Sequence, residues 1–257
     1  MVDQKIDLLA VLAVFERLAR EAGAAIMAHY HEECRLEDKS DASPLTAADL
    51  AADKVICAGL RSAYPHIKLV TEEQSDTHQG IKDDDHYFLV DPLDGTKEFL
   101  SRNGQFTVNI ALIVHGKPVA GVVFGPALDR LFLGAKGIGA TETDLSGTRP
   151  IHVRALPQNP VAVASRSHRS PETEVFLHAH KITNCVSAGS SLKFCLVATG
   201  EADIYPRFGP TMEWDTAAGQ AILEAAGGAV LTPEGQAFHY SKANHRNGDF
   251  IAWGGRL

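Results

Sequence analysis

Tyr87-Phe88-Leu89-Val90-Asp91-Pro92-Leu93-Asp94-Gly95-Thr96 is the stretch that says most about the fold and chemistry of this chain. Four successive apolar residues indicate a short buried strand, and the Asp-Pro pair that follows marks its end. Functional loops are commonly built where strands end. Asp91 and Asp94 stand three residues apart in a turn made by Pro92 and Gly95. We therefore expect two carboxylates to converge at the edge of a β-sheet.

This turn has the chemistry of a divalent-cation site. In a tight turn both carboxylates and an intervening carbonyl, such as that of Leu93, can point at one spot, and an all-oxygen environment suits Mg²⁺. Gly95 allows a ligand to approach the backbone closely. The amides of Gly95 and Thr96, at the start of a predicted short helix at 97–100, can donate to phosphate oxygens. The alternative is an ordinary turn in which Asp91 and Asp94 cap local backbone groups.

Two further acidic positions can join the same site. Glu72 and Glu73 follow the apolar segment 67–70, again at a predicted strand end, and one of them can complete a first metal site. Asp215 follows Trp214 at the start of a predicted helix that closes at 227–228, with Asp215 or Thr216 as its N-cap. A solvated acidic pair at Glu72 and simple helix capping at Asp215 are the alternatives.

The N-terminal part of the chain predicts two helices separated by a polar loop at 31–44. The apolar stripe of the first helix is Leu8, Leu12, Phe15, Ala19, Ala22 and Ile26. The stripe of the second is Ala48, Ala51, Val55 and Ala58. Asp49 and Asp53 lie four residues apart on another face of the second helix, so one of them can face a cleft.

The middle of the chain predicts antiparallel strands. Segments 107–114 and 118–124 form a hairpin around His115-Gly116-Lys117, and 131–133 is a further short strand. Segment 161–164 begins a second half. We expect an N-terminal α+β lobe at 1–150 that carries the metal-binding turn, and a C-terminal α/β lobe at 151–257 that carries Asp215. Periodicity by itself establishes a mixed α and β fold.

Composition excludes several classes of function. The 257-residue chain has a formal net charge of −8, so it has no overall positive field to attract nucleic acid polymers or anionic lipid. No apolar run is long enough for a transmembrane helix. The four cysteines, Cys34, Cys57, Cys185 and Cys195, are scattered and form no C-x-x-C pair. They indicate reduced thiols in a cytoplasmic protein rather than disulfides or a zinc cluster.

Several motifs together resemble a known family. Segment 91–96 followed by Lys97-Glu98-Phe99, together with segment 214–219, resembles the two signatures of the inositol monophosphatase superfamily. Segments 43–49 and 189–195, with Glu72-Glu73, match its 3'(2'),5'-bisphosphate nucleotidase branch in order, so the resemblance covers nearly the whole chain. It implies a two-lobed αβαβα sandwich of alternating helix and sheet layers. Phe88 departs from the family, which often has Trp there.

The resemblance also implies a magnesium-dependent site with two or three Mg²⁺ ions. Glu72, Asp91 and the Leu93 carbonyl would hold a first metal. Asp91, Asp94 and Asp215 would hold a second, with Asp91 bridging the two. Thr96, hydrogen-bonded to Asp49, would orient the water nucleophile with Glu72 as a third catalytic residue, and the amides of Gly95 and Thr96 would hold the scissile phosphate.

The implied reaction is hydrolysis of adenosine 3',5'-bisphosphate (PAP) to AMP and phosphate, as in PAP recycling during sulfur assimilation. The sulfated analogue 3'-phosphoadenylyl sulfate (PAPS) is a second candidate substrate. The implied substrate contacts are Glu72, Leu93, Asp94, Gly95, Thr96, Gly189, Ser190, Ser191, Lys193 and Asp215. For Gly189 to Lys193 the alternative is a Ser-rich helix start with a solvated Lys193.

Two other functions stay open at this point. An inositol-1-phosphate or sugar-phosphate phosphatase would use the same metal chemistry, although inositol-specific relatives usually carry an Asn-containing tripeptide in place of Lys97-Glu98-Phe99. An inactive nucleotide-binding regulatory protein would keep the fold without turnover. A homodimer and peripheral attachment to the cytoplasmic face of the inner membrane are further expectations that the sequence leaves open.

Overall fold

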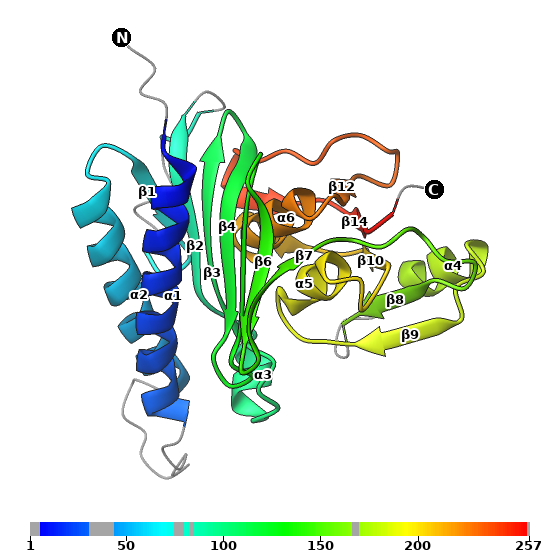
Figure 1. Ribbon diagram of the computed structural model, residues 1–257, viewed down its shortest axis with the longest axis horizontal. Coiled ribbons are helices and arrows are strands. Elements are labelled where there is room, and N and C mark those ends of the chain that lie inside the picture. Colours follow the sequence, from blue (N-terminus) through cyan, green and yellow to red (C-terminus); the bar gives the residue numbers. More distant parts are fainter. Residues whose placement is uncertain (1–5, 31–43, 75–79, 83–84, 166–169, 256–257) are drawn as a thin grey trace.

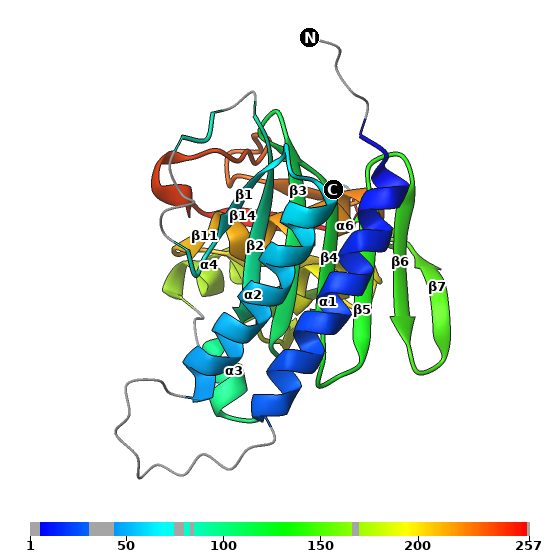
Figure 2. The ribbon, with the colours of Figure 1, turned by 90° about the vertical axis from the view of Figure 1, so that its left-hand side faces the viewer.

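Five alternating layers make up the molecule. The computed structural model describes residues 6–30, 44–74, 80–82, 85–165 and 170–255, with side chains described from residue 47 onward in the second helix. Cys34 and nearly all of the predicted 31–44 loop therefore lie outside the described residues. Helices α1 (Leu8–Tyr30) and α2 (Pro44–Ala63) cover one face of a seven-stranded sheet (Figures 1 and 2). Helices α5 (Leu192–Ala198) and α6 (Glu213–Ala225) separate it from a five-stranded sheet, and α4 (Pro171–Ala179) lies beyond. The predicted αβαβα sandwich is confirmed.

The seven-stranded sheet follows the order of the chain. Its strands are β1 (Lys68–Thr71), β2 (His86–Asp94), β3 (Thr107–Val114), β4 (Lys117–Gly125), β5 (Arg130–Ala135), β6 (Gly139–Asp144) and β7 (Gly147–Ile151). Only the β1–β2 pair is parallel. The predicted hairpin is confirmed as β3–β4, and its turn residues His115 and Gly116 have φ of 49° and 66°, as a two-residue turn of the primed type requires.

The smaller sheet contains strands from the C-terminal part of the chain. Their spatial order is β12 (Ala229–Leu231), β14 (Phe250–Trp253), β10 (Ile204–Arg207), β8 (Val161–Ala164) and β9 (Asn184–Ser187). A two-stranded ribbon, β11 (Thr211–Met212) and β13 (Arg246–Asn247), stands apart, and the 3₁₀ turn η2 (Ala243–His245) leads into it. Ala162 and Ile204 face the α4 side, whereas Val163 and Tyr205 join the core shared with α5 and α6. This alternation follows from the period of two in a strand.

The register of α2 differs from the prediction. Ala51 and Val55 are half-buried and Ala58 is exposed. The buried stripe instead is Ala48, Ala52, Ile56 and Leu60. The prediction was wrong because adjacent alanines fit the helical period equally well. The stripe of α1 is correct from Phe15 to Ile26, while Leu8 and Leu12 are half-buried.

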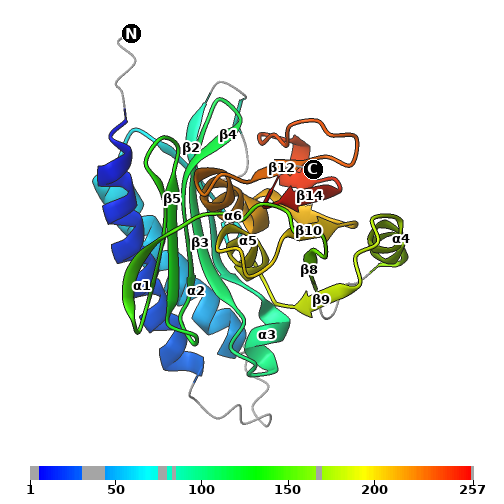
Figure 3. The ribbon, with the colours of Figure 1, turned by 45° about the vertical axis from the view of Figure 1, so that its right-hand side comes forward.

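Helix α6 connects the two halves of the chain. It comes from the C-terminal half but lies against β3, β4 and β5 of the first sheet (Figure 3). Glycines make this close approach possible. A Cβ at Gly121 would lie 2.6 Å from the carbonyl oxygen of Ala218, and a Cβ at Gly134 would lie 2.6 Å from the Cα of Ile222. The first sheet ends at Ile151, close to the predicted boundary between lobes 1–150 and 151–257. One hydrophobic core contains residues from both sides of this boundary, so the division into two lobes stays a proposal.

Between β2 and β3 the chain makes one more short helix. Helix α3 (Thr96–Leu100) begins directly after Gly95, whose φ of 102° is unfavourable for any residue with a side chain. The predicted short helix at 97–100 is therefore present. Because α3 lies directly after β2, its first residue, Thr96, lies close to the end of that strand.

Candidate metal and phosphate site

Carboxylates from three parts of the chain meet at the end of β2. Glu72 directly follows β1, Asp91 lies within β2, and Asp215 is in the first turn of α6. Each offers a carboxylate oxygen, and the three oxygens all lie within 4.8 Å of one another. Asp91 is 1% exposed, whereas Glu72 reaches the surface. The folded chain thus brings together residues that are 143 positions apart in sequence at their extremes, Glu72 and Asp215.

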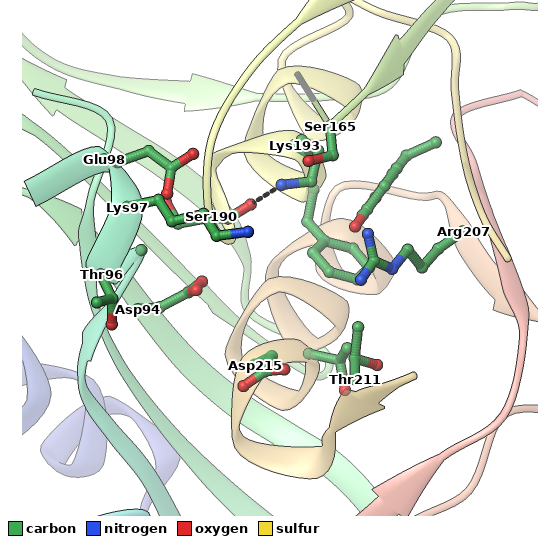
Figure 4. A pocket seen from close by; sticks show the side chains of 14 residues that line it. Asp94, Thr96, Lys97, Glu98, Ser165, Ser190, Lys193, Arg207, Thr211 and Asp215 are labelled. Carbon is green, nitrogen blue, oxygen red and sulfur yellow. Dashed lines mark hydrogen bonds between the residues drawn. The ribbon is translucent and has the colours of Figure 1, made fainter. Parts of the chain in front are cut away.

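Asp94 faces the same region and is held by neutral donors. Its Oδ2 lies 2.9 Å from Ser191 Oγ and 3.3 Å from Asn109 Nδ2. Ser191 Oγ also lies 2.6 Å from the backbone oxygen of Asp215 and accepts from Asn109 Nδ2 at 2.8 Å. The hydroxyl of Ser191 therefore ties the end of β2 to the start of α6. Figure 4 shows Asp94 and Asp215 on opposite sides of the space between these elements.

The predicted N-cap of α6, Asp215 or Thr216, is three or four residues too late. The helix starts at Glu213, with Met212 as the N-cap residue, so Asp215 occupies the third helical position. There its Oδ2 accepts from the backbone N–H of Met212 at 2.8 Å, which is the returning contact of a capping box. The same carboxylate thus fixes the helix start and takes part in the acidic cluster.

The pKa of each carboxyl group in the acidic cluster is raised, and burial is the largest cause in every case. Burial, then the charges of Asp94 and Glu73, raise the pKa of Glu72 to about 7. Burial, then Asp94, raise the pKa of Asp215 to about 8. Burial is also the main reason why the pKa values of Asp91 and Asp94 are raised. The charged forms are disfavoured because each carboxylate loses water and faces like charges.

A divalent cation fits this set of donors. Among the described residues, none of the ion pairs includes Glu72, Asp91, Asp94 or Asp215. Several carboxylates without a bonded Lys or Arg are costly in a folded protein unless a cation compensates them. Oxygen-only ligands are what hard divalent cations prefer.

Asp49 lies at the α2 side of the cluster. Burial, then the charges of Glu73, Glu72 and Asp53, raise its pKa to about 8. Thr96 is exposed at the start of α3, and none of the hydrogen bonds between described residues joins it to Asp49. The structure therefore brings Asp49 to the acidic cluster without the predicted contact. The joint role of Asp49 and Thr96 stays a prediction.

An open cleft of about 260 Å³ extends from the carboxylates toward the smaller sheet. Its lining includes Asp94, Gly95, Thr96, Lys97, Glu98, Ser165, Ser190, Lys193, Tyr205, Arg207, Thr211 and Asp215 (Figure 4). The cleft therefore has an acidic end, at Asp94 and Asp215, and a basic end, at Lys193 and Arg207.

Lys193 is buried, so the expectation of a solvated Lys193 was wrong, although α5 does start directly after Ser190 and Ser191. Lys193 is 5% exposed, its Nζ donates to the Ser190 carbonyl at 2.5 Å, and it lies 5.3 Å from the centre of the Tyr205 ring. Burial, partly offset by Asp94 and reinforced by Arg207, lowers its pKa to about 8. Arg207 was not predicted. Its Nη2 donates to the Pro210 carbonyl at 3.1 Å, and its buried Nε has no hydrogen-bond partner among the described residues.

The remaining predicted substrate residues have partners within the protein. The backbone N–H of Gly189 donates to Gln105 Oε1 at 3.0 Å, and Ser190 Oγ donates to the Gln105 carbonyl at 2.8 Å. Ser191 is 1% exposed and bonded to the Asp94 network. These contacts position the loop, and direct substrate contacts from Gly189, Ser190 and Ser191 stay predictions.

The layered sandwich and the carboxylate cluster at the end of β2 define a class of α/β proteins with an acidic site that can hold a divalent cation. The model of the inositol monophosphatase family matches residues 7–252 of the chain. The chain belongs to this family, whose members are metal-dependent phosphatases, and the resemblance drawn from the motifs is confirmed.

The relatives identify the branch that this chain resembles. It is 47% identical over 227 residues to a protein of Escherichia coli K12 and 49% identical over 227 residues to one of Salmonella typhimurium LT2, covering 88% of this chain and 92% of each relative. Both relatives are named 3'(2'),5'-bisphosphate nucleotidase CysQ.

Solved structures agree with this placement. The crystal structure of CysQ from Bacteroides thetaiotaomicron, described as a bacterial member of the inositol monophosphatase family, is 37% identical and superposes with a TM-score of 0.86 over 96% of this chain and 98% of that one. An inositol monophosphatase from Anabaena is 28% identical with a TM-score of 0.78, covering 97% and 92%. Both family branches thus share the same fold.

Proposed function

We propose that this chain is a magnesium-dependent 3'(2'),5'-bisphosphate nucleotidase that cleaves the 3'-phosphate of PAP and yields AMP and phosphate. The names of its relatives support this activity. The observation that carries the proposal is the cleft that joins the carboxylate cluster to the cationic pair Lys193 and Arg207. A substrate with two separated phosphates matches such a two-ended cleft, because one phosphate can sit at the metal end and the other at the basic end.

In this proposal the chain supplies the metal ligands. Glu72, Asp91 and the Leu93 carbonyl hold a first Mg²⁺, and Asp91, Asp94 and Asp215 hold a second, for a total of two or three ions. When bound at such a site, divalent cations activate a water molecule and neutralise the charge on the departing oxygen. No nucleophilic side chain is needed for that chemistry.

The remaining groups position the substrate and the water. The amides of Gly95 and Thr96 hold the scissile phosphate at the start of α3. A carboxylate oxygen of Asp49 accepts from the hydroxyl of Thr96, and this pair orients the water for in-line attack. No hydrogen bond between the described residues joins Thr96 to Asp49, and we expect this bond to form when metal and substrate bind.

Lys193 and Arg207 bind the second, non-scissile phosphate. Both line the cleft, and the buried Nε of Arg207 is available as a donor. An anion between them would offset the burial that lowers the pKa of Lys193, so phosphate binding favours its charged form. Arginine is well suited to this role because its guanidinium presents several donors in a fixed plane.

The test is phosphate release from PAP, 3'-AMP and inositol 1-phosphate, each with Mg²⁺. We expect the highest kcat/KM with PAP, and PAPS measured beside it establishes the second candidate substrate. Arg207→Met is expected to raise the KM for PAP about tenfold or more, since a charge-assisted hydrogen bond is lost from a desolvated site. The same variant should change the KM for 3'-AMP little, because 3'-AMP lacks the second phosphate.

The matched control is Arg246→Met, which removes an exposed arginine of β13 outside the cleft. Equal losses for PAP and 3'-AMP in Arg207→Met would contradict the assignment of the basic end. Preference for inositol 1-phosphate would replace the nucleotidase with the inositol phosphatase alternative. Lack of turnover with every substrate would favour a nucleotide-binding regulatory protein.

Location and assembly remain proposals. No helix in the described part of the chain is long and apolar enough to cross a membrane. We propose a cytoplasmic enzyme acting on a small nucleotide rather than on nucleic acid, with homodimer formation and peripheral attachment to the inner membrane as further possibilities. Analytical sedimentation tests for the homodimer, and flotation with anionic vesicles tests for membrane attachment.

A further inference from the structure

Helix α2 carries a row of polar residues that face the segment holding Glu72. Asp49, Asp53, Cys57 and Arg61 follow one another at intervals of four, so they lie along one side of the helix. Asp53 is 4% exposed although it is charged. Charged residues are seldom buried to this degree without a specific set of partners.

The partners of Asp53 flank Glu72 in the chain. Asp53 Oδ1 accepts from Thr71 Oγ1 at 2.5 Å, and Thr71 is fully buried. Asp53 Oδ2 accepts from Gln74 Nε2 at 2.5 Å. One carboxylate therefore holds the residue before Glu72 and the second residue after it.

Two more contacts fix the geometry of this arrangement. Arg61 Nη2 donates to Gln74 Oε1 at 3.0 Å, which orients the Gln74 amide so that its Nε2 faces Asp53. On the opposite side, the backbone N–H of Glu72 donates to the Val90 carbonyl of β2 at 3.1 Å. The Glu72 segment is thus held between α2 and the strand that carries Asp91.

We propose that Asp53 is a positioning residue that fixes the 71–74 segment and thereby holds Glu72 in place as a metal ligand. This inference rests on the proposed function, because it assigns a role toward the Mg²⁺ that Glu72 would bind. Partners that orient metal ligands contribute strongly to metal affinity without touching the metal. Asp53 has no contact with substrate in this assignment.

The chemistry of Asp53 favours a carboxylate over an amide at this position. Both of its oxygens act as acceptors, and Cys57 Sγ is a further donor to Oδ1 at 3.3 Å. An asparagine would accept through one oxygen and present an N–H₂ to one of these donors.

The experiment measures Mg²⁺ binding directly, by calorimetric titration of metal-free protein. We expect Asp53→Ala and Gln74→Ala each to weaken Mg²⁺ binding about tenfold or more, and Asp53→Asn to weaken it less. The Mg²⁺ concentration for half-maximal PAP hydrolysis should rise by the same factor. Saturating Mg²⁺ should restore most of kcat, because the ligands themselves are intact.

The matched control is Asp203→Asn. Asp203 is likewise buried, at 1% exposed, and its carboxylate is bonded to Arg154 at 2.7 Å and 2.8 Å, away from the acidic cluster. This variant should lower the melting temperature in EDTA while leaving Mg²⁺ affinity at the wild-type value. Gln74→Ala keeps the proposal testable if Asp53→Ala fails to fold, since Gln74 is only half-buried.

The possible results separate the two proposals. Wild-type Mg²⁺ affinity in both Asp53→Ala and Gln74→Ala, with lowered melting temperatures, would overturn the positioning role and leave the proposed function standing. Failure of the wild-type protein to bind Mg²⁺ would overturn the proposed function and this inference with it. Weakened binding in both variants and unchanged binding in Asp203→Asn would support it.

Discussion

Burial of the Asp91 carboxyl group is costly to the stability of the folded protein. Asp91 is 1% exposed, and burial followed by the charges of Glu72, Asp94 and Asp215 raises its pKa well above the ordinary value. Its Oδ1 accepts from the backbone N–H of Leu93 at 3.1 Å, which offsets only part of its large loss of hydration. A side chain of this kind is retained at the expense of stability, and a bound cation is the simplest compensation.

Asp94→Asn and Asp215→Asn should therefore separate activity from stability. Each removes one negative charge from a cluster of like charges, so in EDTA near pH 8 we expect the variants to unfold at the same or a higher urea concentration than the wild type. Turnover of PAP should fall by at least about 100-fold, because even outer partners of metal ligands contribute 10- to 100-fold. Near wild-type kcat/KM in either variant would remove that residue from the site.

The residues of the acidic cluster were predictable from sequence, but the residues that contact and surround them were not. Asp91 and Asp94 lie in one short motif, whereas Asn109 and Arg207 have no motif of their own. Asn109 had a detectable signal, because it is a polar residue inside the apolar run 108–114, and the structure pairs it with Asp91 across β2 and β3. Arg207 ends strand β10 in the second sheet, and only the packing of that sheet brings it to the cleft.

Helix α6 places Asp215 through its contact with the first sheet. This contact depends on Gly121 and Gly134, where the backbone of the helix approaches the strands too closely for a side chain. The prediction identified α6 but placed its start at Asp215 or Thr216, since Asp is common at both the N-cap and the third position. The approach to the sheet was invisible in sequence, because the glycines occur in an ordinary β pattern.

Gly121→Ala should damage the site from a distance. The added Cβ would lie 2.6 Å from the Ala218 oxygen and 2.9 Å from its Cα, so the backbone of α6 has to move. Overpacking of this kind costs about 1–3 kcal/mol of unfolding free energy. Because Asp215 is in the first turn of α6, we also expect weaker Mg²⁺ binding. Urea unfolding and calorimetric titration measure the two effects.

Gly248→Ala is the matched control, since a Cβ at Gly248 meets no atom within 4 Å. It should change neither Mg²⁺ affinity nor the midpoint of unfolding by more than a few tenths of a kcal/mol, as is usual for surface substitutions. If Gly121→Ala matched this control, the close approach of α6 would not determine the position of Asp215.

The five-layer fold could be predicted from the sequence because the family motifs span nearly the whole chain. Local patterns alone supplied less: β6 and β7 were missed because their segment, 139–151, is rich in Gly, Thr and charged residues. These strands form the outer part of the first sheet, where Glu142 is fully buried between Arg130 and Arg149 at 2.6 Å from each. Charged side chains that compensate one another in this way do not follow the alternation from which strands are predicted.

The pH dependence of stability follows from the acidic cluster as a unit. In the metal-free protein the pKa of Glu72 rises from 4.5 to about 7, and those of Asp49 and Asp215 rise from 3.8 to about 8. Between about pH 4 and pH 8 the folded state therefore binds more protons at these groups than the unfolded state does. Stability contributed by their neutral forms is present at low pH and is lost as the pH rises through the folded-state values.

We therefore expect metal-free protein in EDTA to be less stable at pH 8 than at pH 6, as measured by urea unfolding. Mg²⁺ should reverse this trend, because its ligands must be deprotonated and binding to the folded state adds about 2.7 kcal/mol at 100 times the Kd. Measurements should stop near pH 8, since the pKa of Lys193 is lowered to about 8 and its titration acts with the opposite sign above that value. In Asp215→Asn the loss of stability between pH 6 and pH 8 should shrink, because one raised carboxyl group is gone. The contrary result would be a wild-type protein that becomes more stable in EDTA between pH 6 and pH 8. It would mean that these carboxylates do not repel one another in the folded protein. The argument for a cation between them would then lose its physical basis.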